Sequence, residues 1–284
     1  MVSCVTSLVS WLLGIVLGTS LLAVPQTAAP QTAAPSTNSA GTHPVRQQLL
    51  RGADISWPNC PKGMGIPGRR SKGEPMPRRT ARFVVVGVTN GPGFYPNPCI
   101  GAQVAWVRSH HRLLGAYAMT TYPRRKEIRR YGGHGPYAVG TRLARLRNTA
   151  YDEAVFNANT MQQTGLQPPR IWVDVEPYPT SPWTRHHSLN RVVVSAAIRG
   201  YHDLGYRVGL YTYANGWHDV VGRWHLSRYP AWVTAGPRGA GNAAAMCRGR
   251  GPTGGRVWLA QWWSPRRDYD LRCAQAPRRA GLTR

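Results

Sequence analysis

The chain has 284 residues, of which 42% are hydrophobic, enough to bury a core and too many for a wholly disordered chain. It carries 36 Lys and Arg residues against 11 Asp and Glu, a formal net charge of +25, and all but three of the cations are arginines. This charge favours an anionic polymer as partner but does not define a fold. Because there are so few carboxylates, each one is a candidate for chemistry.

The N-terminal 48 residues are expected to precede the folded domain. Residues 5–24 are apolar and uncharged and are followed by small residues, which is typical of a secretory signal peptide. The same segment is long enough to span a bilayer as an uncleaved anchor. We expect residues 1–29 to be a signal peptide or signal-anchor and residues 30–48 a flexible linker rich in Pro, Thr and Ala. The protein would then be secreted and associated with the cell wall, or tethered to the membrane.

Apolar segments and helical patterns alternate from residue 49 to residue 276. The segments rich in Val, Ile, Trp and Tyr predict strands at residues 53–57, 83–88, 113–119, 171–175, 208–212, 231–235 and 257–262. Apolar residues with a 3.6-residue period predict helices at residues 142–164 and 189–204. A basic tail, residues 277–284, is expected to fray.

This alternation predicts a single parallel α/β domain, either a TIM-type barrel or a doubly wound sheet. No GxGxxG or GxxxxGK[ST] motif follows a strand, which disfavours a nucleotide-binding doubly wound fold. Residues 236–256 contain many glycines, and we expect no helix there. The barrel is therefore expected to lack helices between its last strands.

The acidic residues fall at the ends of predicted strands. Asp174 and Glu176 end one strand, Asp54 lies in the first, and Asp268 and Asp270 follow the last. The carboxyl ends of parallel barrel strands converge at one mouth, and residues i and i+2 of a strand point to the same face. Two close carboxyl groups, one protonated and one ionised, are what glycosidic bond cleavage requires. The alternative is that these acids only bond nearby backbone or arginine groups.

Aromatic residues point to a carbohydrate partner. The chain has 11 Trp and 13 Tyr but only three Phe, and Trp and Tyr offer a flat face with a polar end that suits a sugar ring. Aromatic residues near strand ends are Trp57, Tyr117, Tyr122, Tyr178, Trp183, Tyr211, Tyr213, Trp232, Trp262 and Trp263. For any one of them, packing in the core is the competing explanation. As substrate-binding residues we select Trp57, Tyr117, Tyr178, Tyr211, Trp232 and Trp262, with Gln261 beside the last.

Four cysteines remain once the leader is set aside: Cys60, Cys99, Cys247 and Cys273. An even set in an exported chain favours disulfides, which could pair in three ways. We predict the nearest-neighbour pairs, Cys60–Cys99 and Cys247–Cys273. No CxxC or CxxH spacing occurs, which disfavours a zinc site. Cleavage of a glycosidic bond by carboxyl groups requires neither a metal nor an organic cofactor, so we expect none.

The order of motifs resembles the glycoside hydrolase family 25 lysozymes, and more closely the exported actinobacterial proteins described as family 25-like. The segments that carry the resemblance are GADISW, FVVVGVTNGPGFYPNPC, LLGAYAMTTYP, IWVDVEPY, GYRVGLYTYANGW, PAWVTAG, VWLAQWW and YDLRC, within residues 50–275. It implies a (β/α)5β3 barrel that cleaves the β-1,4 bond between N-acetylmuramic acid and N-acetylglucosamine.

The resemblance also implies roles for the acidic residues. Glu176 would be the general acid, and Asp174 would stabilise the oxocarbenium-like transition state or orient the substrate's N-acetyl group. Asp54 and Asp270 would complete the group, with Asp268 as the alternative to Asp270. The chain departs from the family in two basic loops, residues 61–79 and 122–147, which we expect to reshape the cleft.

Three functions are compatible with these features. The first is an exported glycosidase that acts on cell-wall polysaccharide as a monomer. The second is a module on the same barrel that binds wall glycan without cutting it. The third, a nucleic-acid binder, is disfavoured because no basic helix has a base-reading pattern and export removes that partner. The basic surface would hold anionic envelope polymers, and a membrane would be a partner only if the N-terminal segment is uncleaved.

Overall fold

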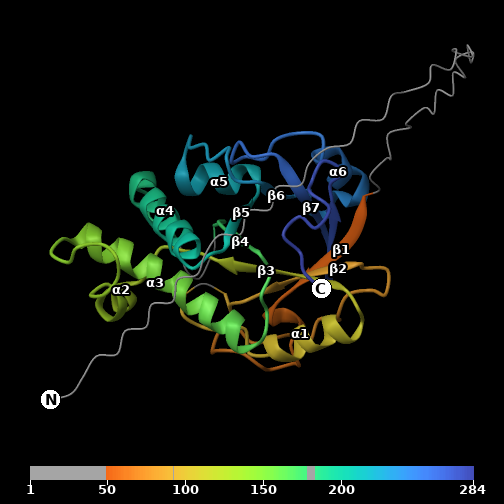
Figure 1. The fold of residues 1–284 in the computed structure, drawn as a ribbon, viewed down its shortest axis with the longest axis horizontal. Coiled ribbons are helices and arrows are strands. Elements are labelled where there is room, and N and C mark those ends of the chain that lie inside the picture. Colours follow the sequence, from red (N-terminus) through yellow and green to blue (C-terminus); the bar gives the residue numbers. More distant parts are fainter. Residues whose placement is uncertain (1–48, 92, 178–182) are drawn as a thin grey trace, which may run out of the picture. The chain divides into compact units, whose positions relative to one another are not determined.

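The computed structural model describes residues 49–284, except residue 92 and residues 178–182. At its centre eight strands form a closed barrel in sequence order (Figure 1). The strands are β1 (Leu50–Ile55), β2 (Phe83–Gly87), β3 (Leu113–Met119), β4 (Arg170–Asp174), β5 (Arg207–Thr212), β6 (Ala231–Thr234), β7 (Val257–Ser264) and β8 (Arg267–Arg272). The expected TIM-type barrel is confirmed.

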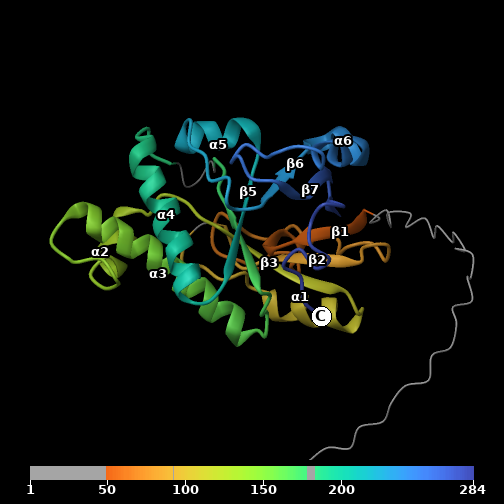
Figure 2. The same cartoon turned by 45° about the horizontal axis from the view of Figure 1, so that its top comes forward.

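Helices connect most consecutive strands of the described barrel. The α-helices are α1 (Ile100–Ser109), α2 (Arg125–Tyr131), α3 (Arg142–Gln163), α4 (His187–Asp203), α5 (Ala214–Val221) and α6 (Gly239–Met246). Two short 3-10 helices, η1 (Trp57–Asn59) and η2 (Gly236–Arg238), follow β1 and β6. Helices α3 and α4 lie side by side against the strands, as Figures 1 and 2 both show.

The last strand closes the barrel in the reverse direction. Neighbouring strands from β1 to β7 are parallel, whereas β8 is antiparallel to both β7 and β1. In this register Asp270 lies opposite Gln261 of β7 on one side and Gly52 of β1 on the other. The reversal is what brings acidic residues of the last strand next to the first strand.

The seven predicted strands and both predicted helices are present, with ends shifted by no more than a few residues. Two expectations about the last third are wrong. The segment RDYDLR forms strand β8, which the sequence did not predict. Its backbone pairs with β1, a strand distant in sequence, so no local pattern marks it. Residues 236–256 contain helix α6, where Ala243–Ala245 offset the neighbouring glycines and Cys247 is tied to Cys273 just after the helix.

Two apolar layers hold the barrel together. Side chains of the strands that point outward pack under the helices, for example Val84, Val173 and Leu210. The layer inside the barrel is made of larger groups: Phe83, Val85, Trp172, Tyr211, Trp232, Leu259 and Leu282. A Cβ on Gly209 would lie 2.4 Å from the Trp172 ring, so the glycine in β5 makes room for this indole.

The C-terminal tail completes the inner layer, so the expectation that residues 277–284 fray is wrong. Leu282 is fully buried in the interior cluster, and Thr283 pairs with Leu114 at the start of β3. Arg272 of β8 donates hydrogen bonds to the carbonyl oxygens of Pro277 and Arg278. The tail therefore closes the base of the barrel, and the folded domain continues past residue 276.

In the described part of the chain, no helix combines the length and the apolar character needed to cross a membrane. The apolar segment at residues 5–24 and the linker at residues 30–48 lie outside the described residues.

Shortening the side chain of Leu282, which fills the base of the barrel, should destabilise the fold. We expect Leu282→Ala to lower the free energy of unfolding by about 2–5 kcal/mol, because it leaves a cavity in a fully buried layer. Leu143→Ala is the matched control, since Leu143 lies on the exposed side of α3 and should change stability by less than about 0.5 kcal/mol. Urea unfolding of both variants tests this, and equal stability would mean that the tail is not part of the core.

Candidate active site

Five carboxyl groups meet at the mouth formed by the carboxyl ends of the parallel strands. They come from β1, from the end of β4 and from β8: Asp54, Asp174, Glu176, Asp268 and Asp270. Each of the four aspartates experiences repulsion from another member of this group, which places them within electrostatic reach of one another. The structure thus brings together every acidic residue that the sequence proposed.

A chain of hydrogen bonds orients Asp54. Gln261 of β7 donates from Nε2 to Asp54 Oδ2 at 2.9 Å, and its Oε1 accepts from the Tyr211 hydroxyl at 2.9 Å. Trp232 donates from its indole nitrogen to Asp270 Oδ1 at 2.8 Å. These donors come from β5, β6 and β7, so three neighbouring strands fix the two aspartates.

Asp54 and Asp270 share their environment and a proton. Burial raises the pKa of Asp54 well above its usual value, and the nearby charge of Asp270 raises it further. Burial also raises the pKa of Asp270 to about 8. A hydrogen bond between the two carboxyl groups favours ionised Asp270 and protonated Asp54. Asp270 is fully buried, whereas Asp54 is 6% exposed, so Asp270 is the deeper member of this pair.

Asp174 and Glu176 form the second acidic pair. Asp174 is only 2% exposed, and its Oδ1 has no hydrogen-bond partner among the described residues. Burial raises its pKa, and the charges of Glu176 and Asp54 add to the effect. Burial raises the pKa of Glu176 to about 7. The backbone of Glu176 is held by Trp183, whose Nε1 donates to the Glu176 carbonyl oxygen at 3.0 Å.

Glu176 lines an open pocket of about 510 Å³ next to this cluster. The remaining walls come from the ends of β5, β6 and β7 and from the segments that follow β5 and β6: Tyr211, Tyr213, Ala214, Asn215, Thr234, Ala235, Gly236, Pro237, Arg238, Met246 and Trp263. Trp263 is 42% exposed, which leaves an indole face free at the pocket wall. A carboxyl group, aromatic faces and amide groups around one cavity suit a sugar ring.

Asp268 lies nearer to solvent than Asp270. It pairs with Trp263 across the β7–β8 ladder, and burial raises its pKa to about 8, with further repulsion from Asp54. The sequence left Asp268 as the alternative to Asp270. The structure gives the two residues different positions, Asp270 deep and bonded to Trp232, Asp268 toward the mouth.

The aromatic residues predicted to bind substrate lie in different parts of the structure. Tyr117, Tyr211 and Trp232 point into the barrel, where the Tyr211 and Trp232 rings lie 4.6 Å apart. Trp57 lies half-buried on η1. Tyr178 lies outside the described residues. Being almost fully buried, Trp232 is a core residue that supports Asp270.

Trp262 lies on the outer face of the barrel, so its selection as a mouth residue is corrected to Trp263. Its ring stacks on Tyr269 at 5.3 Å and packs against the apolar cluster under α6. Alternation along β7 explains the difference, since Gln261 points inward and its neighbour must point outward. Trp263 was within the wider aromatic set, whereas Asn215 and Arg238 were missed because nothing in their local sequence marks them.

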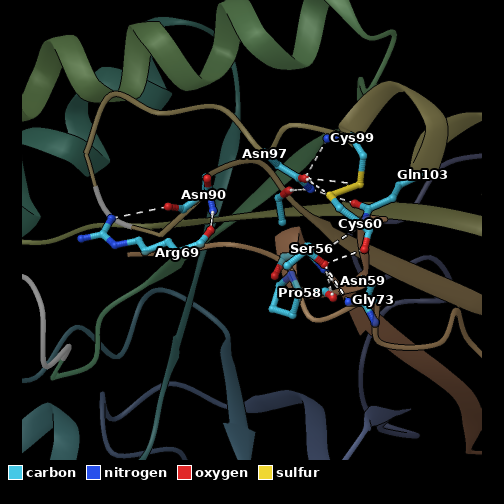
Figure 3. The surroundings of a disulfide bond; sticks show 12 residues. Ser56, Pro58, Asn59, Cys60, Arg69, Gly73, Asn90, Asn97, Cys99 and Gln103 are labelled. Atoms are coloured by element: carbon cyan, nitrogen blue, oxygen red, sulfur yellow. Dashed lines mark hydrogen bonds between the residues drawn. A yellow bond between two sulfur atoms is a disulfide. The ribbon is translucent and has the colours of Figure 1, made fainter. Parts of the chain in front are cut away.

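The loops that follow β1 and β2 are fastened together beside the mouth (Figure 3). The predicted disulfide Cys60–Cys99 is present and joins the end of η1 to the start of α1. Asn97 donates to Gln103 at 2.7 Å, and Gln103 donates to the Ser56 carbonyl oxygen at 2.7 Å. The segment just after β1 is thereby fixed. The second predicted disulfide, Cys247–Cys273, joins the end of α6 to the end of β8.

The two basic loops are ordered. In residues 61–79, Asn90 donates to the Arg69 carbonyl oxygen at 3.1 Å and accepts from the Ile66 amide at 2.8 Å, which ties this loop to the one after β2 (Figure 3). Residues 122–147 contain helix α2 and the first turns of α3. Glu127 of α2 is buried and paired with Arg124. The remaining cations of α2 face solvent.

The comparisons with known proteins concern the fold and one stretch of the sequence. Residues 144–244, from α3 to α6, match the family model described as lysozyme-like protein 1, and this stretch includes Asp174 and Glu176. No curated protein matches the chain in sequence.

Solved structures with a similar fold include three lysozymes. The muramidase from Acremonium alcalophilum is 14% identical with a TM-score of 0.51, over 78% of this chain and 92% of that one. The family 25 lysozyme from Aspergillus fumigatus is 16% identical with a TM-score of 0.50, over 81% and 96%. The bacterial lysozyme from Streptomyces coelicolor is 14% identical with a TM-score of 0.50, over 78% and 91%. Residues 144–244 therefore match a lysozyme-like family model, and the described domain has the barrel fold of these solved structures.

The buried carboxyl groups should make stability depend on pH. Because burial raises the pKa of Asp270 from 3.8 to about 8, its contribution to stability is complete below about pH 4 and is lost as the pH rises toward about 8. Asp270→Asn keeps an acceptor for Trp232 and cannot ionise, so we expect a smaller loss of stability between pH 5 and pH 8 than in the parent protein. Urea unfolding at both values measures this. Asp203→Asn, at an exposed site, should keep the parent's pH slope, and the same slope in Asp270→Asn would contradict the assignment.

Proposed function

We propose that the protein is an exported glycoside hydrolase that cleaves β-1,4 bonds of cell-wall glycan, in the manner of a muramidase. The observation that carries the proposal is Glu176, whose carboxyl group lines the open pocket and whose pKa is raised by burial to about 7. A carboxylic acid that keeps its proton near neutral pH is suited to protonate the leaving oxygen of a glycosidic bond.

Asp174 lies on the same side of the strand end as Glu176 and would act on the other reacting group. Its Oδ1 has no partner in the described residues, so it is available to a ligand. When protonated, this carboxyl group could donate to the carbonyl oxygen of an N-acetyl group. When ionised, it would stabilise the positive charge that develops at the anomeric carbon.

Asp54 and Asp270 support this pair from inside the barrel. We propose that Asp54 holds the acidic group in register through Gln261 and Tyr211, with Asp270 as its proton-sharing neighbour. The sugar would lie against Trp263 and Tyr213 in the pocket, with Asn215 as an amide partner. Trp57 and Tyr117 remain candidates on the side of β1 and β3, and the role proposed for Tyr178 stays a prediction.

The family likeness supports the same substrate class. One solved structure of similar fold is the autolysin LytC from Streptococcus pneumoniae in complex with a synthetic peptidoglycan ligand. Two disulfides agree with an oxidising compartment, as expected for an exported protein. Anionic polymers of the envelope would be held by the arginine-rich exterior, and the protein would act as a monomer.

Removing the acid should abolish cleavage. We expect Glu176→Gln to lower kcat on purified wall glycan by about 10²- to 10⁴-fold, because the amide cannot deliver a proton. In the parent protein, activity should fall as the pH rises through about 7, where Glu176 loses its proton. Release of reducing ends measures both, and Asp203→Asn serves as the control with an exposed acid removed.

The binding-only alternative has a distinct outcome. If the parent protein is retained on purified wall but releases no reducing ends at any pH, the barrel is a glycan-binding module and not an enzyme. Full activity of Glu176→Gln with an intact fold would refute the assignment of the general acid.

The exposed indole should contribute to substrate binding. We expect Trp263→Ala to raise KM by about tenfold, equivalent to about 1.4 kcal/mol, with a smaller change in kcat, because it removes a stacking face. Trp263→Phe should restore much of the affinity. Trp262→Ala is the neighbouring control: it loses the contact with Tyr269 on the outer face, so it should lower stability and leave KM unchanged. A KM effect in Trp262→Ala alone would reverse the assignment.

A further inference from the structure

A second cavity lies at the opposite end of the barrel from the acidic mouth. Its volume is about 760 Å³, and its walls come from the starts of β1 and β3, the residue before β2, the end of α1 and the tail: Leu50, Arg82, Arg108, His111, Arg112, Leu113 and Arg284. Because these strands run in parallel, their amino ends lie at the base of the barrel, remote from Glu176. The proposed glycosidase function makes no use of this cavity.

The walls of this base pocket are cationic. None of the lining residues is an Asp or a Glu, and the ion pairs of the described residues, Arg124–Glu127 and Arg199–Asp203, lie elsewhere. Arg108 and Arg112 are held in place by neutral groups, since each donates one Nη2 hydrogen bond to a carbonyl oxygen, at 2.6 and 2.8 Å. The guanidinium groups are therefore positioned while their charge stays uncompensated within the described chain.

Arg82 is the freest of these groups. Its side chain is exposed, and it makes no hydrogen bond or ion pair with any described residue, although its backbone pairs with Arg51 and Leu113. An uncompensated guanidinium next to two others is unfavourable by repulsion, and an anion bound between them would remove that repulsion.

His111 supplies an independent observation, because its backbone is in the left-handed region with φ of 53°. It occupies the position just after the C-cap of α1. Helices α3 and α4 end with glycines at the equivalent positions, Gly165 and Gly205, with φ of 70° and 84°. A side chain in this conformation is strained, whereas glycine adopts it freely. The chain thus keeps an unfavourable histidine where its imidazole lines the base pocket.

We propose that the base pocket binds an oligoanion of linked phosphate groups. Guanidinium groups present paired N–H donors that match phosphate oxygens, and the imidazole of His111 adds a further N–H donor. The pocket is large enough for more than one phosphate group. It is a concave site bounded by separate elements, which suits a soluble phosphate chain better than a flat lipid surface.

Such a site would hold the protein on a phosphate polymer by its base and leave the acidic mouth free for glycan. It is independent of the chemistry at Glu176, and its loss should leave cleavage of phosphate-free glycan unchanged. Failure of the base pocket and failure of the proposed enzyme activity are therefore separate results.

The test is calorimetric titration of the purified protein with tripolyphosphate and, separately, with inorganic phosphate. We expect tripolyphosphate to bind more tightly, and Arg82→Gln to weaken its binding by about tenfold or more. Arg129→Gln is the matched control, since Arg129 is an exposed arginine of α2 outside the pocket, and it should change Kd by less than about twofold. Equal weakening by both variants would show binding to general surface charge and would overturn the proposal.

His111→Gly adds a readout that a structural role alone cannot mimic. The glycine removes the backbone strain, so the variant should unfold at a higher temperature than the parent and yet bind tripolyphosphate more weakly. Unchanged binding of tripolyphosphate by His111→Gly would show that His111 does not contact the anion. Absence of tripolyphosphate binding, or binding only to vesicles that contain phosphatidylglycerol, would refute the oligophosphate site.

Discussion

The structure depends on buried carboxyl groups that form no ion pair with a cation of the described chain. Asp54, Asp174 and Asp270 are buried at the barrel mouth, and within the described chain the side chains that donate to Asp54 and Asp270 are the neutral groups of Gln261 and Trp232. Burial raises the pKa of such a carboxyl group, so the group keeps its proton near neutral pH and can donate it to a neighbouring carboxylate or to a ligand. The arrangement of Gln261, Tyr211 and Trp232 follows from this requirement, because each supplies or relays a hydrogen bond that fixes which oxygen is available. The reversed direction of strand β8 contributes to this arrangement. It places Asp270 beside β1 and Asp268 nearer to solvent.

The burial of these carboxyl groups also affects how charge is distributed over the domain. Five of the eleven acidic residues lie at the mouth, and Glu127 and Glu153 are buried on α2 and α3, so few carboxylates remain on the surface. The arginines cover the exterior and the base. Even the buried Arg170 lies at the amino end of β4, where burial lowers its pKa to about 10. The domain therefore has an acidic, proton-holding end and a cationic end. A strongly basic chain can keep protonated acids at its mouth because, among the described residues, none of these acids forms an ion pair with an arginine.

Sequence reasoning recovered those features that rest on local pattern. The apolar strands, the helices on either side of β4 and the near-neighbour disulfides were all predicted, because periodicity and spacing are properties of short segments. Asp54, Asp174 and Glu176 were placed at one mouth because parallel strands carry their carboxyl ends to the same side, whereas the position of Asp268 and Asp270 depends on the reversed strand β8. Features that depend on distant partners were missed. The segment RDYDLR does not look like a strand until Gly52 and Gln261 flank it. The choice between Trp262 and Trp263 needed the inward direction of Gln261, and the roles of Asn215 and Arg238 needed the pocket.

The buried position of Leu282 has a consequence for the way the chain reaches its fold. The innermost layer joins residues of β2 and β3 to the last residues of the described chain, and β8 pairs with β1 across almost the whole domain. Contacts of such long sequence separation form late and slowly. Until the final segment arrives, the half-formed barrel exposes apolar edges and leaves its acidic residues hydrated. Slow closure of the barrel keeps the chain extended for longer, a property that would suit the export proposed above, because a chain crosses a membrane most easily before it folds.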